Sequence, residues 1–486
     1  MAEHFDVLIV GAGLSGIGAA RHLKSQCPGK TFAILEGRAT MGGTWDLFRY
    51  PGIRSDSDMY TLGYAFKPWT GAKAIADGPS IMAYLRETAR EHDIERHIRY
   101  GHRFTGAQWS SADAQWTVDV ERDMGEGQLE RSTIRCSFLL MCSGYYDYAE
   151  GYTPDFPGRE RFAGQVIHPQ HWPEQLDVTG RRVVVIGSGA TAVTLIPELA
   201  RQAAHVTMLQ RSPTYMVSRP SADRIADGLH RRFGPRLAHA LTRWKNVLFG
   251  MFIYRLCQRR PGQMKARLVD LAARQLPPGY DVARHFTPRY RPWEQRLCLV
   301  PDGDLFKAIR EGKASVVTDR IETFTETGIR LASGTELPAD LIVTATGLKL
   351  KVMQGQALVV DGQAVDPAAL VSYKGLMFAG VPNFASVFGY TNASWTLKAD
   401  LASGFVCRVL DHLRKTGTRQ CVPRLDDTAL PLRPWVDFSS GYFQRVIDQL
   451  PRQGAAMPWR LSQNYVTDLM TLRHGAVDDG VLRFSA

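Results

Sequence analysis

The chain has 486 residues, enough for two or three domains with a sizeable core, and a small binding module is therefore excluded. Hydrophobic residues make up 44% and charged residues 22%, which excludes a disordered chain and a membrane channel. The net charge of +11 is the unusual feature, and it raises the question of an anionic partner.

Cysteine content and the N-terminus indicate the compartment. Seven cysteines are scattered without a CxxC pair, so neither a disulfide framework nor a metal site is expected. Glu3 and Asp6 stand where a signal peptide needs basic residues. The most apolar stretch, 247–254, is far shorter than the ~20 residues of a spanning helix. We expect a cytoplasmic protein without a transmembrane segment.

A βαβ unit is predicted at the N-terminus. An apolar strand, a glycine turn, a helical pattern and a second strand follow one another at 5–10, Gly11-Ala-Gly13-Leu-Ser-Gly16, 14–24 and 31–35. Glycines in this pattern permit a tight turn and close approach of a pyrophosphate to the helix N-terminus. Glu36, 20 positions after Gly16, can accept ribose hydroxyls. The unit therefore predicts binding of FAD or NAD.

A second unit of the same kind begins 176 residues later. Its strand, turn, helix and second strand lie at 183–186, Gly187-Ser188-Gly189-Ala190-Thr191-Ala192, up to about 200, and 206–209. The separation is too large for two halves of one sheet, so two dinucleotide domains are predicted. The second strand ends at Arg211 and Ser212 instead of an acid. These side chains suit a 2′-phosphate, which favours NADPH; the alternative is an exposed arginine without a ligand.

Residues 218–280 form a helical insertion with most of the net charge. Within 221–280, twelve basic residues face three acidic ones, a net charge of +9, and the rest of the chain carries only +2. We favour a solvated helical face near the NADPH phosphates. Peripheral contact with the inner face of a membrane is the alternative, because Trp244, Phe249 and Phe252 lie among the arginines. No recognition motif accompanies the charge, so no nucleic-acid partner is expected.

Two longer motifs carry a family resemblance. The stretch 162–173 (FAGQVIHPQHWP) resembles the FxGxxxHxxxW(P/D) fingerprint of type I Baeyer–Villiger monooxygenases, with Phe162, Gly164, His168 and Trp172 at its defined positions. The stretch 43–56 (GTWDLFRYPGIRSD) is similar to their second signature, GxWxxxxYPGxxxD. The resemblance covers essentially the whole chain and is strongest to the ethionamide-activating subgroup.

The resemblance implies a function. NADPH would reduce FAD, O₂ would form a C4a-peroxyflavin, and one oxygen atom would be inserted beside a ketone carbonyl to give an ester or lactone, with oxidation of sulfur in thioethers or thioamides as a second activity. Arg296 matches the cation that stabilises the developing charge, and Asp56 the carboxylate that orients it. Two alternatives remain: a monooxygenase of nitrogen and sulfur only, and a membrane-associated flavin protein whose main role is binding.

The family pattern also assigns neighbours of the cofactors. Beside the glycine turns, the residues carried over as contacts of FAD or the nicotinamide are Ser15, Thr44, Trp45, Asp46, Leu47, Arg54 and Phe104. His168 in the linker is expected to govern domain movement, and Trp172 to pack at the same hinge. Gln295 replaces a lysine that many relatives place before the catalytic arginine, so Arg211 is expected to carry more of the 2′-phosphate binding.

The sequence thus predicts an α/β flavoprotein with two Rossmann-like domains. Residues 1–150 and 341–486 are assigned to the FAD domain, 151–217 and 281–340 to the NADPH domain, and 218–280 to the basic helical insertion. The expected partners are a small ketone or organosulfur substrate and O₂; no oligomeric state is predicted.

Overall fold

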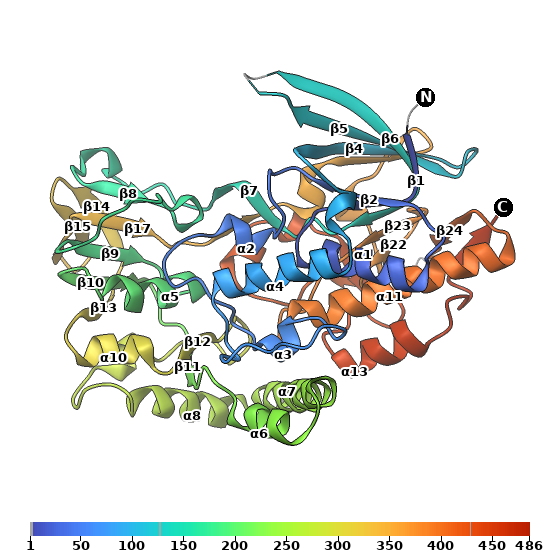
Figure 1. The fold of residues 1–486 in the computed structure, drawn as a ribbon. Coiled ribbons are helices and arrows are strands. Elements are labelled where there is room, and N and C mark those ends of the chain that lie inside the picture. The colour runs from blue at the N-terminus through green and yellow to red at the C-terminus, as the bar shows by residue number, and fades with distance from the viewer. Residues whose placement is uncertain (1–2, 126–127, 428) are drawn as a thin grey trace.

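The computed structural model describes residues 3–125, 128–427 and 429–486, and two large sheets dominate the part it describes (Figure 1). The larger sheet has the order β20-β19-β4-β5-β6-β1-β2-β3, and β23 pairs with β6. Its strands are β1 Glu3–Val10, β2 Phe32–Glu36, β3 Ile98–Tyr100, β4 His102–Ser110, β5 Gln115–Asp123, β6 Leu129–Met141, β19 Ala357–Val360, β20 Gln363–Ala364 and β23 Phe384–Ser386.

Both faces of this sheet are covered. Successive residues of β1 alternate between two clusters: Val7 and Ile9 pack with the helices, and Leu8 and Val10 with residues of β4 to β6. The predicted βαβ unit is present, with β1 parallel to β2. The covering helices, below the sheet in Figure 1, are α1 Leu14–Gln26, α4 Gly78–Glu91 and α11 Trp395–Thr416.

The second sheet is parallel, with the order β13-β10-β9-β17-β8. Its strands are β8 Gln165–Ile167, β9 Arg182–Ile186, β10 His205–Gln210, β13 Ala314–Thr318 and β17 Leu341–Thr344. Helices α5 Ala190–Leu199 and α10 Asp304–Arg310 pack with one of its two core clusters. The other contains residues of the small sheet β14 Ile321–Thr325, β15 Gly328–Leu331 and β16 Glu336–Pro338.

One predicted boundary is wrong. The division at residue 341 assigned 341–344 to the first domain, but β17 pairs with β9 and β8 in the second sheet. An apolar strand is stabilised by the strands beside it, so these pairs decide the unit to which it belongs. The return to the first unit follows β17, where β18 Leu348–Leu350 runs antiparallel to β7 Tyr146–Gly151.

The insertion lies at the lower edge of the molecule in Figure 1. It contains α6 Arg224–Arg232, α7 Pro235–Arg259 and α8 Pro261–Ala273, with α9 Val282–His285 after it. The parallel pair β11 Met216–Arg219 and β12 Cys298–Pro301 frames it. Within the part of the chain that the structure describes, no helix has both the length and the apolar character needed to cross a bilayer.

Short elements complete the fold. In the first unit these are α2 Thr44–Leu47, α3 Met59–Leu62, β21 Ser372–Tyr373 and β22 Met377–Phe378. The C-terminal part adds β24 Gln420–Pro423, β25 Leu432–Pro434, α12 Gly441–Gln444, β26 Arg452–Gly454, α13 Tyr465–Asp468 and β27 Leu482–Ser485.

Candidate active site

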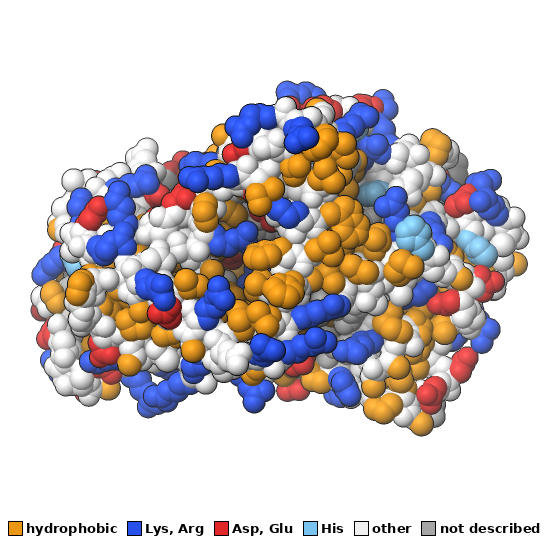
Figure 2. All heavy atoms as spheres, turned by 90° about the horizontal axis from the view of Figure 1, so that it is seen from below, with side chains coloured by type: hydrophobic (Ala, Val, Ile, Leu, Met, Phe, Trp, Pro, Cys, Tyr) orange, Lys and Arg blue, Asp and Glu red, His pale blue; other side chains and the backbone are white. Residues whose placement is uncertain are grey.

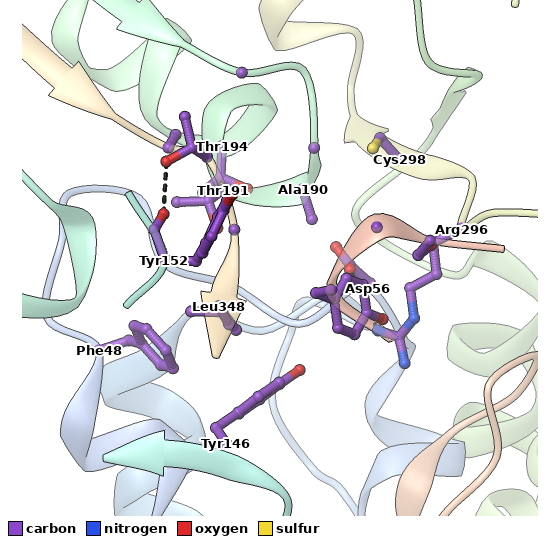
Figure 3. A pocket seen from close by; sticks show the side chains of 18 of the residues that line it. Phe48, Asp56, Tyr146, Tyr152, Ala190, Thr191, Thr194, Arg296, Cys298 and Leu348 are labelled. Carbon is purple, nitrogen blue, oxygen red and sulfur yellow. Dashed lines mark hydrogen bonds and ion pairs between the residues drawn. The ribbon is translucent and has the colours of Figure 1, made fainter. Parts of the chain in front are cut away.

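A cavity of about 1080 Å³ lies between the two sheet units, and both glycine turns open into it. Its lining contains Gly13 of the first turn and Gly189 of the second. Arg296 and Asp56 also line it, and their side chains lie beside each other (Figure 3). Carboxyl ends of strands meet here, which is the edge where open α/β sheets bind ligands. Segments more than 170 residues apart in sequence therefore converge on one site.

The first glycine turn leaves room for a phosphate group. Gly11 has φ +104, and a Cβ there would lie 2.7 Å from the carbonyl oxygen of Cys142. A Cβ on Gly16 would overlap the carbonyl oxygen of Gly11, so neither position accepts a side chain. Gly13 caps α1 without a side-chain hydrogen bond, which leaves the first helical N–H groups available to an anion.

Glu36 stabilises this turn from behind the cavity. Its carboxylate accepts hydrogen bonds from the N–H groups of Ala12 at 2.9 Å and Arg38 at 3.0 Å. Burial raises the pKa of Glu36, and these two hydrogen bonds oppose the shift. Gly11, Gly16 and Glu36 are not among the residues that line the cavity.

The second glycine turn has the same construction. Gly187 has φ +131, and a Cβ there would overlap the carbonyl oxygen of Ala345. A Cβ on Gly189 would meet no atom within 4 Å, so the helix N-terminus faces open space in the cavity. Both turns thus fit the pyrophosphate of a dinucleotide, because each combines a backbone that excludes side chains with an uncapped helix start.

Side chains around the second turn are polar or basic. Ser188 contacts Thr214, with 2.8 Å between their hydroxyl oxygens. Arg211 and Ser212 line the cavity as predicted, and Arg320 lines it as well. Arg320 was missed because it follows β13, a strand remote in sequence that pairs with β10. Ala190 and Thr191 also line the cavity, whereas Ala192 is buried in the core behind them.

Arg296 and Asp56 face each other in the cavity wall. Nη1 of Arg296 lies 3.9 Å from Oδ2 of Asp56. Burial raises the pKa of Asp56, and the charges of Arg296 and Arg54 oppose this shift. Burial lowers the pKa of Arg296, but three nearby tyrosines and Asp56 outweigh it, so the pKa is raised. The guanidinium is therefore a fixed positive charge at every working pH.

Arg54 joins the two units beside this pair. Its Nη1 donates to Oδ2 of Asp304, the first residue of α10, at 2.5 Å. Arg54 lines the cavity, as do Ser15, Thr44 and Trp45. The predicted nicotinamide-side contact is thus located at the cavity, with its charge paired to the second unit.

Aromatic residues that the sequence did not single out form much of the wall. They are Tyr145 in the loop after β6, Tyr146 at the start of β7, Trp395 at the start of α11, and Tyr442 in α12. Nε1 of Trp395 donates to Oγ of Ser15 at 2.8 Å, and the rings of Tyr145 and Trp395 stack with 5.2 Å between centroids. The position of Tyr145 and Tyr146 just after a buried parallel strand could have indicated them.

Three residues carried over from the family pattern lie outside the cavity lining. The Asp46 carboxylate contacts Arg38 at 2.5 Å and Arg49 at 3.3 Å, so its charge is satisfied by the loops before and after α2. Leu47 packs against the core of the second unit. Phe104, on β4, is buried among the aromatic residues of the first sheet. Neighbouring residues of a helix point in different directions, so a motif that includes all of 44–47 does not show which of their side chains reach the cavity.

The fingerprint residues lie at the linkers and not at the cavity. Nδ1 of His168 accepts a hydrogen bond from the N–H of Gln170 at 3.1 Å, and Nε2 lies 3.1 Å from the carbonyl oxygen of Gly347. Burial lowers the pKa of His168, which favours the neutral ring. The ring connects the chain that enters the second unit with Gly347, where the chain returns to the first unit. Phe162 packs edge-on against Phe324.

The other two fingerprint positions have their own surroundings. A Cβ on Gly164 would lie 2.7 Å from the carbonyl oxygen of Asp340, so this position accepts no side chain. Trp172 lines a separate pocket of about 420 Å³ that also contains Arg49 and Glu198.

Comparison with known proteins gives the class. Residues 75–260 match the family model described as flavin-binding monooxygenase-like, and residues 9–87 match that of an NAD(P)-binding Rossmann-like domain. The first model is that of a class of monooxygenases, and the full-length relatives show the same class. The chain is 56% identical over its full length to the FAD-containing monooxygenase EthA of Mycolicibacterium smegmatis, covering 98% of that protein. It is 47% identical to the probable FAD-binding monooxygenase AlmA of Acinetobacter baylyi, covering 97%. The chain belongs to this family of FAD-containing monooxygenases.

Solved structures confirm the predicted fold class. An oxidized steroid monooxygenase bound to NADP matches with a TM-score of 0.78 and 22% identity over 99% of both chains. OTEMO in complex with FAD and NADP matches with a TM-score of 0.76 and 19% identity over 100% of both chains. The resemblance in the two sequence motifs is thereby confirmed at the level of family and fold.

Proposed function

We propose that this chain is an FAD-containing, NADPH- and O₂-dependent Baeyer–Villiger monooxygenase. The overall reaction converts a ketone, O₂, NADPH and a proton into an ester or lactone, water and NADP⁺. One observation carries the proposal: the Arg296–Asp56 pair lies in the wall of the cavity into which both glycine turns open. We propose oxidation of sulfur in thioethers or thioamides as a second activity of the same site.

The two turns divide the cofactors between them. We assign FAD to the first turn, where Gly13 offers the N-terminus of α1 and Ser15 lies against Trp395. We assign NADPH to the second, where Gly189 offers the N-terminus of α5 and Arg211 supplies a cation for the 2′-phosphate. We therefore keep the FAD and NADPH domains proposed from the sequence, except that residues 341–344 are assigned to the NADPH domain.

FAD, when bound, would pass electrons from NADPH to O₂ and would deliver one atom of that O₂ to the substrate, the other leaving as water. The protein supplies charge and position. Arg296 places a permanent positive charge where negative charge develops on the carbonyl oxygen of the substrate, a preorganised contribution worth about 3–4 kcal/mol. Asp56 orients the guanidinium and does not change its protonation.

The aromatic wall excludes water from the reacting atoms. Tyr145 is packed between Trp395 and Phe443, with ring centroids 5.2 Å and 5.9 Å away. Exclusion of water lowers the local dielectric constant and so strengthens the interaction between the Arg296 charge and the developing negative charge. It also favours apolar ketones and sulfides as substrates.

The linkers allow the two cofactor units to move as bodies. We propose that His168 couples them, because its ring joins the outgoing chain to Gly347 of the returning chain. His168 lies outside the cavity lining, which supports a positioning role over direct catalysis. Peripheral contact of the basic insertion with a membrane also remains a prediction from sequence.

The test is an assay of products over a panel of ketones and thioethers with NADPH and FAD. Esters or lactones detected by mass spectrometry are the expected result. Sulfoxides without any ester would favour the alternative of a monooxygenase of nitrogen and sulfur only. A complete lack of flavin reduction by NADPH would contradict both and favour the binding protein.

A further inference from the structure

Helix α7 turns an apolar stripe toward solvent. Large apolar side chains recur at helical spacing over four turns and are 41–61% exposed: Leu237, Leu241, Trp244, Leu248 and Phe252. Phe249 beside them is 53% exposed. The stripe is about 22 Å long, from the rise of a helix over 15 residues. An exposed apolar surface of this regularity marks an interaction site more often than a random surface does.

The orientation of α7 is fixed from its other side. Arg243 is buried and donates from Nη1 to the carbonyl oxygens of Tyr60 and Gly63, each at 2.8 Å. Its Nη2 lies 3.6 Å from Oδ2 of Asp400. Rotation of α7 would break these contacts and leave a buried guanidinium unpaired, which is strongly unfavourable. The stripe therefore stays exposed in this fold.

Basic side chains lie on α7 itself and on α6 and α8, which contact it. Lys245 pairs with Asp223 and Arg274 with Asp270, so two of the acidic residues of the insertion are already neutralised. Nine other basic side chains have no ion pair with any described residue: Arg224, Arg231, Arg232, Arg236, Arg255, Arg259, Arg260, Lys265 and Arg267. Figure 2 shows hydrophobic side chains gathered on this underside of the molecule, with lysine and arginine beside them.

We propose that this docking face, the apolar stripe with its nine basic residues, binds the surface of an anionic lipid bilayer. The stripe would enter the layer between headgroups and acyl chains, where Trp244 is well suited, and the arginines would contact lipid phosphates. A second copy of the chain fits poorly, because its own charge of +9 would face the first. Nucleic acid would leave the stripe exposed to water.

The inner side of the same helix backs the cavity. Val247 packs with Tyr390, which precedes Trp395 in the chain, and with Leu397 in the first turn of α11. The ring centroids of Tyr254 and Trp293 are 5.8 Å apart, and Trp293 is three residues before Arg296 in the chain. Docking would thus bring segments that line the cavity close to the bilayer. If the proposed function holds, its substrates include ketones and sulfides dissolved in the membrane.

The test is co-sedimentation of the full chain with lipid vesicles. Phosphatidylcholine vesicles should bind little protein, and vesicles that also contain phosphatidylglycerol should bind it in a manner that weakens with salt. The double variant Leu248→Ser/Phe252→Ser should lower the affinity for the anionic vesicles about ten-fold or more. The matched control Leu129→Ser/Leu432→Ser, exposed by 52% and 43% on the first sheet and on β25, should bind like wild type.

Charge is tested separately. Arg231→Glu/Arg232→Glu should weaken vesicle binding and its salt dependence, whereas Lys313→Glu/Arg330→Glu, at exposed sites of the second unit, should lower the affinity much less. Absence of wild-type binding to anionic vesicles would overturn the proposal, and so would equal binding by the stripe variant. A dimer lost in the stripe variant would assign the face to a second copy, and comparable binding of duplex DNA would assign it to nucleic acid.

Activity separates this proposal from the proposed function. With a water-soluble ketone, Leu248→Ser/Phe252→Ser should oxidise NADPH at the wild-type rate, because neither residue lines the cavity. With a long-chain ketone held in anionic vesicles, the same variant should show a raised apparent KM. An equal KM would refute delivery from the membrane. If the wild type oxygenates no ketone, the proposed function fails, while the vesicle result still decides the docking face.

Discussion

Gly189→Ala is expected to impair NADPH binding without impairing folding. The residue has φ −77 and ψ −178, a conformation open to alanine, and a Cβ there would meet no atom within 4 Å. The free energy of unfolding should change by less than about 1 kcal/mol, because a lower entropy of the unfolded chain offsets a slightly poorer helix cap.

The added methyl group would enter the space that a phosphate needs to reach the start of α5. Loss of one charged hydrogen bond costs about 1.5–3 kcal/mol, which corresponds to a Kd for NADPH raised about 10- to 150-fold. The dependence of the flavin reduction rate on NADPH concentration, followed by stopped flow, measures this constant, and thermal unfolding measures stability.

Two other glycines make the comparison decisive. Gly404→Ala, in α11, also places its Cβ in open space but lies outside the cavity lining, so it should leave the Kd unchanged. Gly187→Ala should destabilise the fold, because φ is +131 and the new Cβ would overlap the carbonyl oxygen of Ala345. A folded Gly189→Ala protein with wild-type affinity for NADPH would refute the assignment of the second turn.

Further predictions concern charge and burial. Arg211→Ala should weaken NADPH binding and reduce the preference over NADH in steady-state kinetics; an unchanged preference would remove Arg211 from the 2′-phosphate site. Burial lowers the pKa of His239 to about 4 from 6.5, so the unfolded chain takes up this proton first. Stability should therefore fall by about 3 kcal/mol as pH drops from 6.5 to 4, and His239→Gln should flatten this part of a denaturation series; an equal fall in the variant would contradict the role of His239. Asp468→Asn should cost about 3–5 kcal/mol in urea unfolding, because Asp468 lies 2.9 Å from the buried Lys398; wild-type stability would show that the pair is dispensable.

The sequence predicted the parts of the site that depend on local backbone chemistry. Positions 11 and 187 require glycine because φ is positive and a carbonyl group lies close to each. In the sequence, such positions are recognised by glycines between a predicted strand and a predicted helix. Asp56 was found because it ends the second family signature, and Arg296 because the resemblance matches it to the family's catalytic cation. Their proximity, 3.9 Å, depends on the packing of two units and could only be expected from the resemblance.

Tertiary packing decided what sequence could not show. Trp395 and Tyr442 reach the cavity from α11 and α12, and no local pattern in the sequence indicates which residues these elements meet. Residues 218–280 were predicted to be helical, yet helical periodicity does not state which side of a helix faces the protein. In the structure the polar side carrying Arg243 is buried, because backbone carbonyls near α3 accept its hydrogen bonds, and the apolar side is left in solvent.

The central claim is that Arg296 supplies the charge on which oxygenation depends, and one measurement tests it most directly. Purified protein with FAD, NADPH and a ketone is incubated under isotopically labelled O₂, and the ester is analysed by mass spectrometry. The wild type should give an ester with one labelled oxygen atom, and Arg296→Ala should oxidise NADPH without forming that ester. Labelled ester from Arg296→Ala at the wild-type yield, or none from the wild type, would contradict the account.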